Sequence, residues 1–165
     1  MQAMKAGTAA PEVALPLVEG GQFSLREALG RGPVVLAFFK VSCPVCQFAF
    51  PYLERIHRAQ RDSGFTMVCV SQDDAKATRA FLREYGITFP TALDDTRRYP
   101  VSDAYGLTNV PTFFYVAPSG SIKLTSVGWS RQDVEELNQL VASAAHQTPA
   151  PVFRPGENVP DFKAG

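Results

Sequence analysis

The sequence has few cysteines, no excess of either charge and no long apolar run near its beginning. Three cysteines among 165 residues are too few for a small scaffold held together by disulfides. Sixteen basic residues balance sixteen acidic ones, so we expect neither a nucleic-acid partner nor an anionic membrane surface. The stretch MQAMKAGTAAPEV has one Lys and no apolar run. We therefore expect no membrane segment and a cytoplasmic protein, or a periplasmic one if a leader has been removed.

The order of apolar patterns predicts one α/β domain. Two runs of consecutive apolar residues, 34–41 and 65–71, are typical of strands buried on both faces, and each precedes a segment with helical periodicity. Ser24 is expected to cap a short helical turn, and Asp73 or Asp74 to open the second long helix. The predicted strands and helices, in chain order, lie at 34–41, 43–63, 65–71, 73–85, 87–93, 112–117, 122–128 and 130–145.

The proposed domain covers residues 1–146, with its core at about 10–145. The remaining residues, 147–165, are rich in Pro and Gly and show no periodicity. We expect them to form an irregular tail along the surface.

Cys43 and Cys46 form the sequence CPVC where the first buried strand meets the helix that follows it. Disulfide exchange needs a thiolate, and a free cysteine, with a pKa near ~8.5, is mostly protonated at neutral pH. The unpaired N–H groups of a helix N-terminus stabilise the anion, so Cys43 is assigned as the attacking thiolate. Cys46 lies three residues on and can close a disulfide with it. Pro44 suits the first helical turn, where its missing N–H is not needed.

Other interpretations of the cysteines are open at this point. A zinc site needs four ligands, and Cys69, His57 and His146 show no companion spacing, so neither a metal nor a cofactor is expected. Inert packing is a second alternative, because a free cysteine behaves as a small apolar residue. Packing is also the expected role of Cys69, within MVCVS, and of Trp129.

Four longer segments carry a resemblance to a known family. They are APEVALP, VVLAFFKVSCPVCQFAFPYL, FLREYGITFP and AYGLTNVPTFFYVAPSGSI. Together they resemble the thioredoxin-like superfamily, in particular its redoxin branch of TlpA-type and ResA-type thiol-disulfide oxidoreductases, which is related to the alkyl hydroperoxide reductase/thiol-specific antioxidant family. The resemblance implies a three-layer α/β/α fold with a central mixed β-sheet, an N-terminal extension and an insert before a hairpin that follows a cis-proline.

The resemblance also implies where a substrate would bind. Cys43 and Cys46 match the redox pair of the family, and Val110-Pro111 matches its cis-proline loop. An extended substrate would pair with the Val110 backbone beside the first cysteine, much as an added strand does. The implied contacts with the substrate lie at Val110, Pro111, Pro44 and Val45.

Two acidic positions of the family are occupied by alanine in this chain. Relatives carry a carboxylate at the position of Ala37 or of Ala49, and it assists deprotonation of the second cysteine. Water or another group must therefore assist Cys46 here, or the step must be slow.

The expected activity is disulfide exchange with a protein or small-molecule thiol or disulfide partner, a role in cell redox homeostasis. Because the family is related to antioxidant peroxidases, the nearest alternative is a peroxiredoxin-like thiol peroxidase with Cys46 as its peroxidatic residue. A non-enzymatic module that binds a metal or a partner protein is the third interpretation. We expect a monomer or a weak dimer.

Overall fold

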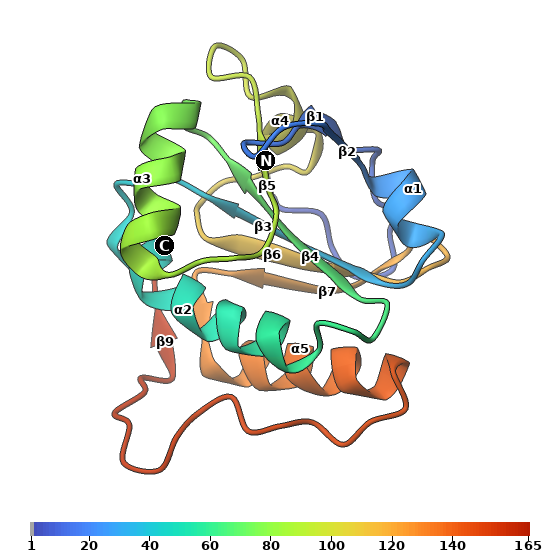
Figure 1. The fold of residues 1–165 in the computed structure, drawn as a ribbon, viewed down its shortest axis with the longest axis vertical. Coiled ribbons are helices and arrows are strands. Elements are labelled where there is room, and N and C mark those ends of the chain that lie inside the picture. Colours follow the sequence, from blue (N-terminus) through green and yellow to red (C-terminus); the bar gives the residue numbers. More distant parts are fainter. Residues whose placement is uncertain (1) are drawn as a thin grey trace.

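A five-stranded mixed sheet forms the centre of the computed structural model, which describes residues 2–165 (Figure 1). Its strands, in spatial order, are β5 (Thr91–Leu93), β4 (Thr66–Ser71), β3 (Val34–Phe39), β6 (Thr112–Val116) and β7 (Ile122–Val127). β3, β4 and β5 run parallel to one another, and β6 is antiparallel to both β3 and β7. β3, which leads to Cys43, is therefore an internal strand, and all six of its residues are buried.

Three helices cover one face of this sheet. They are α2 (Pro44–Ala59), α3 (Ala75–Tyr85) and α5 (Arg131–Ala144). Alternate residues of β3 point to this face, where the ring of Phe39 lies 4.7 Å from that of Phe50 and 4.8 Å from that of Phe81. α2 ends four residues earlier than predicted, because Gln60 and Ser63 form a turn in which the Ser63 N–H donates to the Gln60 carbonyl.

The opposite face is covered by shorter elements. They are β1 (Ala14–Pro16), β2 (Gln22–Ser24), α1 (Leu25–Leu29) and α4 (Pro100–Ala104). Ser24 caps α1 by accepting the Glu27 N–H, as predicted. The hairpin β1-β2 and α4 were not predicted, because elements of three to five residues are too short to show a periodic pattern. The two covered faces give the α/β/α arrangement, and the predicted fold class is confirmed.

The segment 147–165 follows the surface of α5 and α2 and returns toward the sheet (Figure 1). It contains β9 (Phe162–Lys163), which pairs antiparallel with β8 (Trp129–Ser130). Val152 and Val159 are buried in the same core as α2 and α5. The segment is thus held by apolar burial as well as by hydrogen bonds.

The longest helix of residues 2–165 is α2, with sixteen residues. No helix in this part of the chain is long and apolar enough to cross a membrane.

Candidate active site

Cys43 occupies the N-cap position of α2, directly after the loop that leaves β3. Its sulfur accepts a hydrogen bond from the Cys46 N–H at 3.2 Å, so it satisfies one of the free donors of the first helical turn. Pro44 is the first helical residue and is exposed, whereas Val45 is half-buried. The predicted position of CPVC at a helix N-terminus is confirmed.

The loop before β6 meets Cys43 from a distant part of the sequence. The Val110-Pro111 peptide bond is cis, as the resemblance implied. The Cys43 thiol donates to the Val110 carbonyl oxygen at 3.4 Å. The Thr112 hydroxyl closes the loop by donating to the Asn109 carbonyl at 2.8 Å. Cys43 and Val110, which are both half-buried, thus meet although they lie far apart in the sequence.

Cys46 differs from Cys43 in its surroundings. It is 0% exposed, and this burial, together with the hydrogen bond to Cys43 and the negative charge of Asp73, raises the pKa of its thiol. A buried thiol that resists ionisation is a poor first nucleophile for an external substrate. The structure therefore separates the two sulfurs into an accessible one and a protected one.

Asp73 holds the loop in front of Cys43. Its carboxylate accepts the Val41 N–H at 2.8 Å, while the Gln47 side-chain amide donates to the Val41 carbonyl at 2.9 Å. Both peptide groups of Val41 are therefore fixed two residues before the reactive sulfur. The sequence offered Asp73 only as a possible cap of α3, a position that Asp74 takes by accepting the Ala77 N–H.

Two other candidates from the sequence, Cys69 and Trp129, are buried in the core. Cys69 is buried in β4, where its sulfur lies 2.9 Å from the Thr91 hydroxyl and where burial raises the pKa of its thiol. Trp129 is 1% exposed and packs against Phe48 and Tyr52. Packing is confirmed for both. Within residues 2–165, no three His, Cys, Asp or Glu side chains converge in a way that could hold a metal ion.

A contact that the sequence did not indicate is made by Gly165. Its carbonyl accepts the Asn109 side-chain amide at 3.2 Å, and a methyl group added to Gly165 would overlap the Val110 carbonyl oxygen. Gly165 therefore lies against the loop that also contacts Cys43. No pattern within residues 147–165 predicts this contact, because the position of Gly165 depends on the path of the whole segment over the domain.

Comparison with known proteins agrees with this arrangement. The model of the AhpC/TSA family matches residues 6–125. The thiol-disulfide oxidoreductase ResA of Halalkalibacterium halodurans is 32% identical over 143 residues, which cover 86% of this chain and 80% of that protein. The protein of the same name from Bacillus subtilis is 31% identical over 122 residues, which cover 73% of this chain and 66% of the relative.

Solved structures share the same architecture. The thioredoxin domain of a thiol-disulfide oxidoreductase from Bacteroides vulgatus aligns with a TM-score of 0.75 at 23% identity and covers 84% of this chain and 99% of that one. MTB DsbF, solved in mixed oxidized and reduced forms, aligns with a TM-score of 0.67 at 25% identity and covers 80% of this chain and 94% of its own. The family match over most of the sequence and the shared architecture establish that this chain is a member of the AhpC/TSA family with a thioredoxin-like fold.

Proposed function

We propose that this chain is a thiol-disulfide oxidoreductase in which Cys43 is the nucleophile and Cys46 the resolving cysteine. One observation carries the assignment: the half-buried Cys43 sulfur accepts the Cys46 N–H at the start of α2 and lies beside the Val110 carbonyl. The helix N-terminus favours negative charge on that sulfur. Relatives that match most of the chain are named thiol-disulfide oxidoreductases, which supports the same activity.

The reaction proceeds in two exchanges. The Cys43 thiolate attacks one sulfur of the substrate disulfide, forms a mixed disulfide and releases the other sulfur as a thiolate. Cys46 then loses its proton and attacks the Cys43 sulfur, which releases the second substrate thiol and leaves a Cys43-Cys46 disulfide. Two electrons pass from the cysteine pair to the substrate, and the reverse sequence transfers a disulfide to a dithiol partner.

The contrast between the two sulfurs fits this order of events. Because burial raises the pKa of Cys46, that residue stays protonated while Cys43 reacts with the external disulfide. Its proton must be lost in the second exchange, where no carboxylate stands at Ala37 or Ala49. Asp73 acts in this scheme as a positioning residue, since it holds Val41 and thereby the loop that presents Cys43.

The same contrast weighs against a thiol peroxidase with Cys46 as the peroxidatic residue. A peroxidatic cysteine must meet peroxide as an accessible thiolate. Cys46 is fully buried, and its surroundings favour the thiol.

A trapping experiment tests the proposal. Reduced Cys46→Ser protein, treated with a small disulfide, should accumulate a mixed disulfide on Cys43, visible by mass spectrometry after peptide digestion. Cys43→Ser should give no such adduct, and Cys69→Ala should still form the Cys43-Cys46 disulfide. A mixed disulfide on Cys46 or none at all would overturn the assignment. A rapid burst of peroxide consumption that disappears in Cys46→Ser would favour the peroxidase instead.

The partner class and the compartment belong to the same proposal. The substrate is a protein or small-molecule disulfide or dithiol, handled by a monomer or weak dimer. The location expected from the sequence, cytoplasmic for the chain as given or periplasmic if a leader has been removed, stays a prediction. Trapping the redox state of Cys43 and Cys46 in fractionated cells tests it, since a reducing compartment keeps the pair as thiols.

A further inference from the structure

Residues 161–165, which we name the strap, run from β8 to the Val110 carbonyl that Cys43 also contacts. β9 pairs with β8 over two residues, and the Arg131 N–H donates to the Asp161 carbonyl at 3.0 Å. Directly before the strap, the Trp129 indole N–H donates to the Pro160 carbonyl at 2.7 Å. The strap is thus attached by main-chain bonds to the residues that follow β7.

Two glycines, Gly128 and Gly165, allow the strap to lie close to neighbouring backbone. A methyl group added to Gly128 would lie 2.6 Å from the Lys163 carbonyl oxygen and 3.1 Å from the Gly165 nitrogen. A methyl group on Gly165 would overlap the Val110 carbonyl oxygen. Main chain therefore packs on main chain at both points, with no room for an intervening side chain or for another polypeptide.

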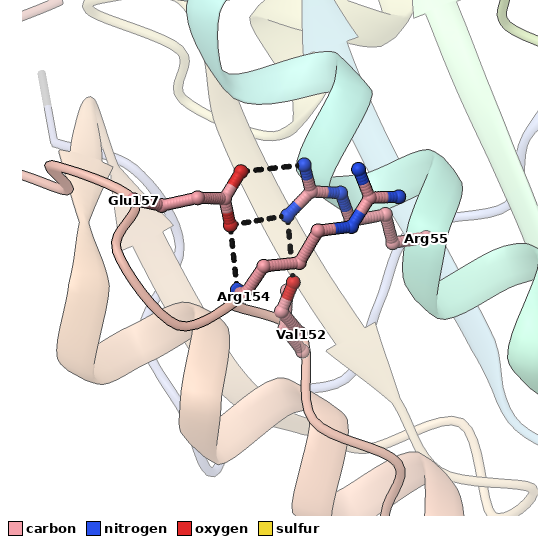
Figure 2. A network of polar contacts seen from close by, with 4 residues as sticks. All are labelled: Arg55, Val152, Arg154 and Glu157. Carbon is pink, nitrogen blue, oxygen red and sulfur yellow. Dashed lines mark hydrogen bonds and ion pairs between the residues drawn. The ribbon is translucent and has the colours of Figure 1, made fainter.

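The part of the tail that leads to the strap is fixed to α2 by an ion pair. Arg55 donates to both carboxylate oxygens of Glu157, at 2.8 and 2.7 Å, and to the Val152 carbonyl at 2.9 Å (Figure 2). The same carboxylate accepts the Arg154 N–H, which closes a turn in the segment. The bidentate geometry defines the path of the tail before it crosses toward the active site.

The position of the strap bears on what the active site accepts. An extended polypeptide that bound as an added strand would need main-chain bonds to the backbone beside Cys43, and the Val110 carbonyl is where those bonds would form. The Gly165 backbone already lies against that carbonyl, and the Asn109 amide holds Gly165 there. The strap thus occupies the side of the loop that a peptide substrate would use.

We propose that the strap is a selectivity element that excludes extended polypeptides from the Val110 backbone and reserves Cys43 for small-molecule disulfides. This inference rests on the proposed disulfide exchange at Cys43 and Cys46. The exchange itself is unchanged: the dithiol reduces one disulfide to two thiols and becomes a disulfide, whichever substrate enters. The strap limits which disulfides reach the Cys43 sulfur, because the groups on either side of the substrate disulfide must fit beside the strap.

A single-turnover comparison tests the proposal with two matched probes. One is hydroxyethyl disulfide, and the other is a linear peptide whose single cysteine carries the same mercaptoethanol group in a disulfide. Reduced protein is mixed with each probe, and formation of the Cys43-Cys46 disulfide is followed by acid quench and mass spectrometry. A variant that ends at Pro160 should react with the peptide at least about tenfold faster than the intact chain, and with the small disulfide within about twofold of it.

Point variants provide the same test without shortening the chain. Gly165→Ala places a methyl group where the Val110 carbonyl stands, so it should move the end of the strap and raise the peptide rate in the same direction by a smaller factor. Arg55→Met removes the ion pair with Glu157 and should also raise the peptide rate by a smaller factor than the shortened chain does. Arg58→Met is the matched control, because it removes an ion pair of the same helix that involves Glu54 and not the tail.

The outcomes separate this inference from the proposed function. If intact and shortened chains both form the disulfide but the ratio of the two rates is unchanged, the strap is not a selectivity element. If the shortened chain reacts more slowly with the peptide, the strap binds peptides and the inference is overturned. If neither chain forms a Cys43-Cys46 disulfide with either probe, the proposed function fails.

Discussion

The cysteine pair at the start of α2 and the segment 147–165 reach the same loop from different ends of the sequence. Cys43 is placed by local structure: a buried strand, a short loop and a helix whose first turn donates to its sulfur. Gly165 is placed by a long path that contacts α5, α2 and β8 in turn. Local structure therefore sets the reactivity of Cys43, whereas contacts between distant residues set the access to it.

Removal of the nucleophile that local structure positions should cause the largest loss of activity. Cys43→Ala removes the nucleophile, so kcat/KM for disulfide reduction should fall by at least about 10³-fold, as for other enzymes that lose their nucleophile. Turnover of a small disulfide measures the loss, and circular dichroism checks that the fold is retained. Cys69→Ala serves as the control, since that thiol is buried in β4. Retention of most of the activity by Cys43→Ala would refute the local account.

The next effect concerns the residue that joins the tail to the sheet. Trp129→Ala removes a side chain that is 1% exposed and that donates to the Pro160 carbonyl. The loss of buried area and the resulting cavity should lower the free energy of unfolding by about 3 to 5 kcal/mol. Chemical denaturation measures this loss, and Trp129→Phe should recover part of it. A loss below about 1 kcal/mol would mean that this packing contributes little.

Docking of the tail should depend on pH through Glu157. Arg55, and then the Arg154 N–H, lower the pKa of Glu157 from its ordinary value of 4.5 to about 2. Because the folded-state pKa lies below the ordinary one, docking of the tail gains stability from this carboxylate above pH 4.5 and loses it as the pH falls toward about 2. Hydrogen exchange of residues 152–163 should show protection that declines over this window in the intact chain. Glu157→Gln should show weaker protection with no such decline.

We expect the smallest change from substituting Asp73, which holds the loop before Cys43. Asp73→Asn keeps an oxygen for the Val41 N–H and removes a negative charge that contributes to the raised pKa of Cys46. The pKa of Cys46 should therefore fall slightly, because this charge is a minor cause of the rise. Ultraviolet absorbance of the thiolate, measured in the Cys43→Ala background, reports this change. Asp74→Asn, at the neighbouring cap of α3, should leave it unaltered, and an increase in Asp73→Asn would contradict the assigned influence of the charge.

The parts that could be predicted from the sequence are those with a strong local signal. The apolar runs gave β3 and β4, helical periodicity gave α2, α3 and α5, and CPVC at the strand-helix junction gave the cysteine pair. The cis bond at Val110-Pro111 followed from the resemblance to the family. The hairpin β1-β2, α4 and β9 escaped prediction, because a few residues fix no period and their conformation depends on what they pack against.

Asp73 shows the same limit within the site. Two adjacent acids after a buried strand predict a helix cap, and Asp74 provides it. The Asp73 carboxylate instead accepts the N–H of Val41, thirty-two residues earlier in the chain. This contact is possible because β3 and β4 lie side by side.

The local sequence is enough to place Cys43 at a helix N-terminus and Cys46 three residues later, because hydrogen bonding within one helical turn depends only on neighbouring residues. The surroundings of the two sulfurs come instead from the packing of distant segments: the burial of Cys46, the Val110 carbonyl beside Cys43 and the tail that lies against that carbonyl. Burial and long-range contacts are properties of packed elements, and they arise only when segments far apart in the chain exclude water from the same place.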